Sequence, residues 1–130
     1  MTGFNQIERS RRTAIYIRIS TYRQQTELKE FATRNGLNFN EKTDMYIDII
    51  SGFKEGEARP QHFILKNKVV AGPYHQILSS EFSRLDRKPS NLLKSIEYYQ
   101  SKNVWLWFGK QQMWVRDTSH KFMESAQAWA

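Results

Sequence analysis

Residues 13–19 carry the pattern that most restricts what this chain can fold into. The run Thr-Ala-Ile-Tyr-Ile-Arg-Ile is rich in β-branched residues, and its isoleucines share one face of an extended chain while Tyr16 and Arg18 share the other. Such alternation is typical of a β-strand. We therefore expect a strand that brings two polar side chains to the residue that follows it, Ser20.

Helix and strand patterns alternate along the rest of the chain. Helical spacing or a helix-opening proline marks residues 22–35, 60–70 and 90–101, and strand-like runs mark residues 38–50, 74–82 and 104–108. This alternation favours an α/β fold in which helical connections cross over a sheet, and no internal repeat competes with it.

The composition limits the classes of function. A chain of 130 residues with 39% apolar residues is long enough for one domain with a core. It has no cysteine, which excludes disulfides and thiol nucleophiles, and its histidines His62, His75 and His120 lack the spacing of metal ligands. No apolar run approaches the roughly 20 residues that span a membrane. We therefore expect a cytoplasmic protein with no metal, no small-molecule cofactor and no membrane partner.

The net charge of +7 favours a polyanionic partner. Lysine and arginine side chains that neutralise phosphates release counterions, which supplies affinity that does not depend on base sequence. The charges are spread along the chain rather than gathered in a tail, so a merely basic surface is the alternative interpretation.

Four polar clusters fall where the predicted sheet would place the carboxyl ends of its strands, the edge at which open α/β sheets bind ligands. They are Tyr16-Arg18-Ser20 with Gln24, Asp48 with Ser51-Gly52, Arg59-Pro60, and Ser83-Arg84-Leu85-Asp86-Arg87. Each cluster alone is ordinary, since a serine at a strand end is usually a turn or cap residue. Their order and spacing together resemble the catalytic domain of the serine site-specific recombinases, the resolvase/invertase superfamily.

This resemblance implies a fold, a reaction and partners. The fold is a resolvase-like three-layer α/β domain with a central mixed, mostly parallel β-sheet flanked by helices. The reaction is site-specific recombination of mobile DNA by integration, excision, resolution or inversion, in which Ser20 attacks the DNA phosphodiester and forms a 5′-phosphoserine intermediate. The partners are double-stranded DNA and further copies of the chain, as a dimer and as an active tetramer on DNA.

The resemblance also makes four arginines phosphate ligands. These are Arg18, Arg59, Arg84 and Arg87. A guanidinium group holds phosphate oxygens in a bidentate fork, so electrostatic stabilisation by arginine can take the place of a metal ion. A permanently charged side chain can also lower the pKa of the serine hydroxyl and steady the leaving oxygen.

Five further residues are expected to support them. Tyr16 and Gln24 would position the serine or the phosphate by hydrogen bonds, and Asp48 would orient an arginine or assist proton movement. Ser51 and Ser83 are expected to position groups beside the DNA phosphate.

The resemblance also suggests how the chain is divided. Residues 1–12 are expected to be a flexible lead and residues 13–130 the catalytic domain, cut near the start of the family's long dimerisation helix and lacking a DNA-recognition domain. The stretch 51–59 contains glycines and is expected to be a mobile loop. We expect Arg59 to reach its working position only in the assembled complex with DNA.

Three residues depart from the family pattern. Ser83 stands where many relatives have aspartate, His75 stands where an aspartate often follows an aromatic residue, and Glu81 stands where a basic residue is common. They leave an alternative open, a catalytically weakened recombinase-fold module for DNA association or subunit assembly. A small nucleotide-binding protein is disfavoured, because no glycine-rich phosphate loop follows the first strand.

Two tryptophans allow two interpretations. Trp105 and Trp107 alternate along a predicted strand and therefore share a face. They could stack on nucleic-acid bases, as in single-strand binders, but we favour burial in the core or a subunit interface.

Overall fold

The computed structural model describes residues 11–19, 23–49, 59–86 and 88–116, apart from the side chains of Ile19, Arg23, Gln24, Ser83, Arg84 and Pro89. The predicted lead falls almost entirely outside this part of the chain. Residues 117–130, where the dimerisation helix is expected, and the predicted loop 51–58 also lie outside it.

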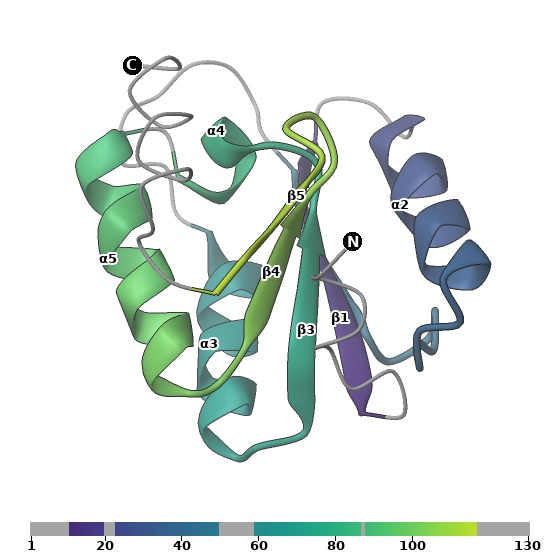
Figure 1. Ribbon diagram of the computed structural model, residues 1–130, viewed down its shortest axis with the longest axis horizontal. Helices are drawn as coiled ribbons and strands as arrows, with labels where there is room; N and C mark the ends of the chain where they lie inside the picture. The colour runs from purple at the N-terminus through teal and green to yellow at the C-terminus, as the bar shows by residue number, and fades with distance from the viewer. Residues whose placement is uncertain (1–10, 20–22, 50–58, 87, 117–130) are drawn as a thin grey trace.

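A single sheet of five strands forms the centre of the described structure (Figure 1). The strands are β1 (Arg12–Ile19), β2 (Met45–Ile49), β3 (Tyr74–Ser79), β4 (Trp105–Phe108) and β5 (Met113–Val115). Their order across the sheet is β2-β1-β3-β4-β5; the first four run parallel and β5 pairs antiparallel with β4. The mixed, mostly parallel sheet predicted from the sequence is therefore confirmed.

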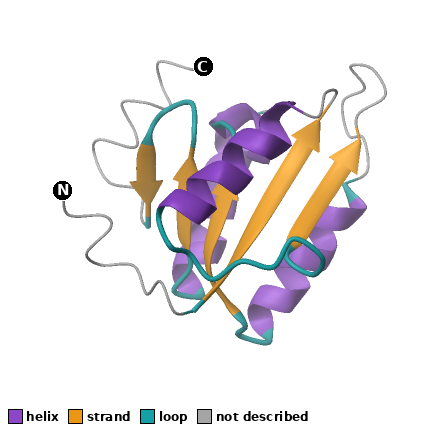
Figure 2. Ribbon diagram, turned by 90° about the vertical axis from the view of Figure 1, so that its right-hand side faces the viewer, coloured by secondary structure: helices purple, strands orange, loops and turns teal. Residues whose placement is uncertain are grey.

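Helices cover both faces of this sheet. Figures 1 and 2 show α2 (Arg23–Arg34) on one face, and α3 (Pro60–Val70), α4 (Phe82–Leu85) and α5 (Pro89–Ser101) on the other. This confirms the predicted three-layer arrangement. None of the described helices is long and apolar enough to cross a membrane.

Two apolar cores result, one on each face of the sheet. Ile15 and Ile17 of β1 pack with Leu28 of α2 on one face. On the other face, Tyr16 packs in the same core as Leu65 of α3 and residues of α5. Because β1 is central and covered on both sides, its side chains from Thr13 to Ile17 are all buried. Truncation of a buried leucine in such a core costs about 2–5 kcal/mol.

The two tryptophans of β4 belong to the core on the α2 face. Trp105 and Trp107 are 8% and 7% exposed, and the ring of Trp107 stacks on Phe31 with 4.4 Å between ring centroids. The prediction that they are buried is therefore confirmed.

Two elements differ from the sequence prediction. The strand expected over residues 74–82 ends at Ser79, and Phe82 instead opens the short helix α4, where its ring packs edge-on against Phe108 at 4.7 Å. Burial of the Phe82 ring in the core between the sheet and helices α3 and α5 outweighs the β-propensity of phenylalanine. Strand β5 was not predicted, because three residues are too few to show a period.

The end of α2 depends on a glycine, as the sequence suggested. Gly36 has φ of +63°, and the amides of Gly36 and Leu37 donate to the carbonyl groups of Thr33 and Ala32 at 3.2 and 3.0 Å. This is the Schellman pattern, which needs a residue in the left-handed conformation after the helix.

We predict that Gly36→Ala lowers the free energy of unfolding by about 1 kcal/mol, because alanine is strained at positive φ. Nothing lies within 4 Å of the site where a Cβ would be, so the cost comes from the backbone alone. Gly36→Asn should cost clearly less, since asparagine tolerates this conformation. Urea unfolding of both variants measures the difference, and equal costs would contradict the explanation.

Candidate active site

The carboxyl edge of the sheet brings the first two predicted clusters together. The strand order reverses direction at β1, and in open α/β sheets such a switch point is where ligands bind, beyond the carboxyl ends of the strands. Arg18 of β1 is in register with Asp48 of β2. Tyr16 lies two residues earlier in β1 and therefore shares their face of the sheet.

The Asp48 carboxylate connects β1, β2 and α3. The Tyr16 hydroxyl donates to its Oδ2 atom at 2.9 Å. The amides of Gln61 and His62 donate to Oδ1 and Oδ2 at 3.0 and 3.1 Å. These two amides belong to the first turn of α3, where backbone N–H groups have no partner inside the helix and favour a negative charge. Asp48 thereby fixes where α3 begins, immediately after Arg59.

Burial keeps the Tyr16 hydroxyl protonated. The side chain is fully buried, and this burial raises the pKa of Tyr16 well above its ordinary value of 10. The positive charge of Arg59 lowers the pKa and the negative charge of Asp48 raises it, but both effects are smaller than that of burial. Tyr16 therefore acts as a hydrogen-bond donor to Asp48.

Arg59 joins this group to the segment that contains the closing arginines. Its Nη2 atom forms an ion pair with Oδ1 of Asp86 at 2.8 Å, and its Nη1 atom donates to the carbonyl oxygen of Leu85. Asp86 also accepts a hydrogen bond from Ser95 of α5 at 2.6 Å. Both partners of the ion pair are largely buried, with 21% and 7% of their side chains exposed.

His62 lies in the middle of this network and was not predicted as a site residue. Its Nε2 atom is 3.1 Å from the Tyr99 hydroxyl, and its ring centroid lies 4.7 Å from that of Tyr16. Burial, with the nearby charges of Arg59 and Lys66, lowers the pKa of His62 from 6.5 to about 2. The imidazole is therefore neutral at physiological pH.

The structure thus brings part of the predicted site together. The Tyr16 hydroxyl is bound to Asp48, and the Arg59 guanidinium is close enough to Tyr16 to lower its pKa, so the three residues form one network. Arg18 is next to Asp48 across the strands. The nucleophile predicted at Ser20 lies outside the described residues, as do Ser51, Arg87 and the side chains of Gln24, Ser83 and Arg84. Among the described residues, no three His, Asp or Glu side chains gather as a metal site would require.

Sequence reasoning missed three buried partners of this network. These are His62, Asp86 as the ion-pair partner of Arg59, and Ser95. Asp86 stands between Leu85 and Arg87 of the closing cluster, so its acidic side chain there was an available signal. Ser95 gave no signal, because a small polar residue on the inner face of a helix is common.

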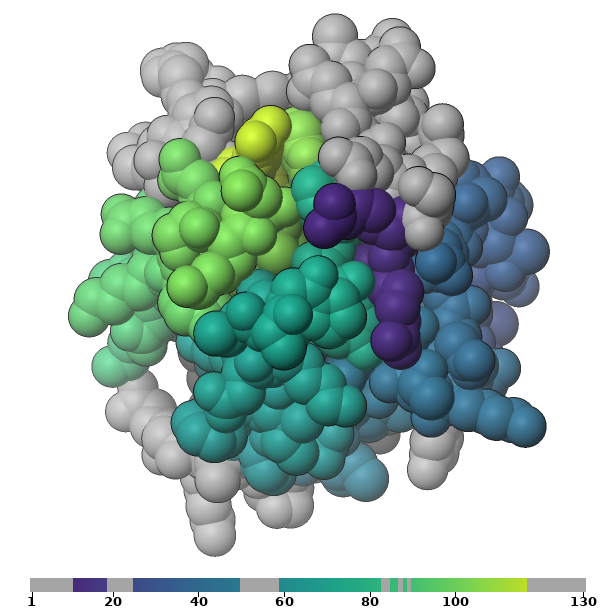
Figure 3. Space-filling model, turned by 90° about the horizontal axis from the view of Figure 1, so that it is seen from below, coloured from purple at the N-terminus to yellow at the C-terminus, as the bar shows by residue number. Residues whose placement is uncertain are grey.

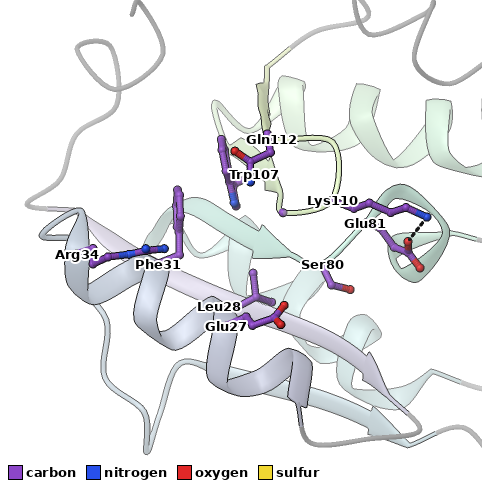
Figure 4. Close-up of a pocket in the computed structure, with 10 residues that line it drawn as sticks. Glu27, Leu28, Phe31, Arg34, Ser80, Glu81, Trp107, Lys110 and Gln112 are labelled. Atoms are coloured by element: carbon purple, nitrogen blue, oxygen red, sulfur yellow. Dashed lines mark ion pairs between the residues drawn. The ribbon is translucent and has the colours of Figure 1, made fainter.

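A separate hollow of about 480 Å³ lies between α2 and the ends of β3 and β4. Figure 4 shows Phe31, Leu28 and Trp107 at this hollow, with the ion pair of Glu81 and Lys110 on its other side. The distance from Glu81 Oε2 to Lys110 Nζ is 3.4 Å. Glu81 thus pairs with a lysine at this hollow, just beyond the carboxyl end of β3. His75 lies at the amino end of β3, at the opposite edge of the sheet.

The chain belongs to the family described as Resolvase, N terminal domain, whose model matches residues 13–130. This places it among the serine recombinase catalytic domains of the resolvase/invertase superfamily, as the four clusters predicted. No protein with curated annotation matches the chain significantly.

Solved structures with the same fold include three recombinase domains. The N-terminal catalytic domain of TP901-1 integrase is 22% identical, with a TM-score of 0.71 over 90% of this chain and 92% of that one. A resolvase family site-specific recombinase from Streptococcus pneumoniae is 20% identical, with a TM-score of 0.73 over 90% and 83%. The C-terminal catalytic domain of ISC1926 TnpA, an IS607-like serine recombinase, is 20% identical, with a TM-score of 0.62 over 90% and 94%. At these identities the likeness shows the fold.

We predict that Asp48→Ala lowers the free energy of unfolding by about 2–3 kcal/mol, because it leaves two helix amides and a buried hydroxyl without their acceptor. Tyr16→Phe removes the hydrogen bond to Asp48 but leaves both helix amides with their acceptor, so it should cost about 1 kcal/mol. The exposed carboxylate of Glu97 on α5 provides the control, and Glu97→Ala should change stability by less than about 0.5 kcal/mol. Urea unfolding tests this order, which fails if Asp48→Ala is as mild as the control.

We predict a second effect on stability from His62. Its pKa is about 2 in the folded domain and 6.5 when unperturbed, so the unfolded chain binds a proton that the folded chain refuses. Stability from this group is complete above pH 6.5 and is lost as the pH falls towards 2. Between pH 7 and 5 the loss is about 2 kcal/mol.

The test compares unfolding at pH 7 and pH 5 in the wild type and in His62→Gln. The pH dependence of His62→Gln should be smaller than that of the wild type by the amount just given. The same dependence in both proteins would show that His62 does not titrate as described.

Proposed function

We propose that this domain catalyses site-specific DNA recombination with Ser20 as the nucleophile. The observation that carries the proposal is the network of Tyr16, Asp48 and Arg59 at the carboxyl edge of β1 and β2. All four motif clusters contribute to it, through Tyr16, Asp48, Arg59 and Asp86. Its charged side chains lie at the edge where β1 ends at Ile19, the residue before Ser20 in the sequence. In a chain that belongs to the resolvase family, this arrangement supports phosphoryl transfer at that edge.

The proposed reaction is a reversible transesterification. The Ser20 hydroxyl attacks the phosphorus atom of a DNA phosphodiester and gives up its proton. The bond from phosphorus to the 3′ oxygen breaks, and the 3′ oxygen takes up a proton, so the step leaves a free 3′ hydroxyl and a phosphoserine link to the 5′ end with no net change in protons. After strand exchange, the 3′ hydroxyl of the new partner attacks the phosphoserine and releases Ser20. The reaction conserves bond energy and needs no cofactor.

Arginine side chains supply the positive charge in this proposal. Arg18, Arg59, Arg84 and Arg87 would hold the non-bridging oxygens, on which negative charge gathers, and would stabilise the leaving oxygen in place of a metal ion. Arg18 is half-buried beside Asp48, so in this proposal it contacts the phosphate from the end of strand β1.

The remaining residues would position these groups. Asp48 holds the first turn of α3 and so determines the position of Arg59, the residue just before the helix. Tyr16 holds Asp48. Gln24, Ser51 and Ser83 would complete the contacts to the phosphate backbone.

Arg59 must change partners before it can bind DNA. In the structure its guanidinium is engaged by Asp86 and by the Leu85 carbonyl group. Phosphate binding therefore requires the exchange of this ion pair, which supports the expectation that Arg59 reaches its working position only when the complex assembles. We infer that the working complex is a dimer at each site and a tetramer on two sites of double-stranded DNA in the cytoplasm.

The same ion pair favours a second candidate function. If Arg59 stays bound to Asp86, the domain keeps the recombinase fold but lacks one phosphate ligand. It would then serve as a catalytically weakened module for DNA association or subunit assembly. Ser83 adds to this case, since an aspartate there would orient Arg84. His75 does not, because it lies at the opposite edge of the sheet.

We predict that the wild-type protein, incubated with the DNA that flanks its own gene, forms a covalent adduct on the 5′ end of cleaved DNA. Denaturing gel electrophoresis with end-labelled DNA detects it. Ser20→Ala should lower the amount of adduct by at least about 1,000-fold, because no other nucleophile replaces the hydroxyl. Ser101→Ala, an exposed serine at the end of α5, is the matched control and should leave it unchanged.

An adduct that persists in Ser20→Ala would refute the role of Ser20. If the wild-type protein binds this DNA but forms no adduct, the assembly module becomes the better explanation.

A further inference from the structure

A basic hollow lies at the amino edge of the sheet, opposite the candidate active site. Its volume is about 410 Å³. It is lined by Arg11, Gly72, Tyr74, His75, Lys102, Asn103, Trp105 and Arg116. Figure 3 looks at this face, where the start of β1 (purple), the turn after α3 (teal), the end of α5 (green) and the end of β5 (yellow) meet. We call it the amino-edge hollow.

The lining is strongly positive. It contains three permanent cations and a histidine, and none of the residues that line it is acidic. Asp44, a buried carboxylate in contact with the lining residue Tyr74, accepts a hydrogen bond from the Tyr74 hydroxyl at 2.9 Å and forms an ion pair with Arg12. The positive charges of Lys102 and Arg116 are therefore not compensated by an acidic residue of the lining.

Arg116 and Lys102 are exposed cations of this lining. The Arg116 guanidinium carbon lies 5.4 Å from the centre of the Trp105 ring, and the Lys102 ammonium 5.8 Å from the centre of the Tyr98 ring. Within the described part of the chain, neither side chain forms an ion pair. A guanidinium that rests on an aromatic face keeps its N–H donors in its own plane, where they can reach a planar or tetrahedral anion.

Helix dipoles account for only part of this cluster. Helices α3 and α5 both end beside the hollow, which is lined by Gly72 and Lys102, and a cation at a helix carboxyl end is stabilising in its own right. Arg11 and Arg116 are not helix residues, since they flank strands β1 and β5. Two arginines from opposite ends of the described chain converge on one hollow with an aromatic floor, which is the composition of a phosphate site.

We propose that the amino-edge hollow binds backbone phosphates of duplex DNA, as a second contact apart from the catalytic edge. The choice of DNA among polyanions rests on the proposed function. Strand β3, which connects the two edges, is 6 residues long, so the edges lie roughly 20 Å apart. A single phosphate cannot reach both. The hollow therefore holds a different part of the DNA from the one that is cleaved, and it does so without reading bases.

The test measures how DNA affinity depends on salt. Fluorescence anisotropy follows binding of a labelled 30-base-pair duplex to the full chain between 50 and 200 mM NaCl. All proteins carry Ser20→Ala, so that covalent capture does not contribute. The test variant is Lys102→Gln with Arg116→Gln. The matched control, Lys42→Gln with Lys94→Gln, removes the same charge from exposed lysines elsewhere.

We expect the slope of log K against log salt to become shallower by about 1.8 in the test variant, because each lost phosphate contact contributes about 0.9. The control should change it by less than half as much. Arg116→Lys alone keeps the charge while it alters the contact with Trp105, and it should keep the slope. Thermal melting shows whether each variant is folded.

Equal changes in the test and control variants, or no change in either, would overturn the proposal. Weaker binding of polyglutamate by the test variant, with an unchanged DNA slope, would overturn it in favour of an acidic protein partner. Adduct formation is scored separately with Ser20 intact, so failure of the catalytic proposal and failure of the second contact are distinguishable.

Discussion

The arrangement of the candidate site depends on one buried carboxylate. Asp48 accepts hydrogen bonds from a hydroxyl of the central strand and from two amides that open α3. Three elements that are distant in sequence are therefore positioned by the same two oxygen atoms. Because buried polar groups destabilise a fold when they are unpaired, moving any one of these three elements would lower the stability of the domain. Because Asp48 fixes the start of α3, it also fixes the position of Arg59, the residue before the helix.

The second connection runs from Arg59 to Asp86 and on to Ser95. It links the start of α3 with the segment after α4 and with α5, so the charged edge of the sheet is braced on the side of the larger core. His62 fills the space between Tyr16 and Tyr99 as a neutral ring. A charged imidazole there would face the positive charge of Arg59 in a poorly solvated space.

The sequence predicted most of the fold and part of the site. Helix α3 was predicted with its observed limits because Pro60 and the Ala71-Gly72-Pro73 break are strong signals. The α/β class followed from the alternating patterns, and the mixed, mostly parallel sheet came through the family resemblance, but the strand order was not predicted. The partner of Arg59 was not predicted, because a pairing between residues 27 positions apart has no local pattern. Strand β5 was missed for a similar reason, since its pairing with β4 defines it.

The ion pair of Arg59 also sets a threshold for the ligand. An arginine that is already neutralised offers little attraction to a lone inorganic phosphate, which would have to displace a buried carboxylate and the Leu85 carbonyl group by itself. A nucleic acid whose neighbouring phosphates are already bound to other residues of the domain presents the next phosphate to Arg59 at high local concentration. The free-energy cost of breaking the Arg59–Asp86 pair is then offset by all of these contacts together. The ion pair of Arg59 would thus make the domain bind free phosphate weakly and a chain of linked phosphates more strongly.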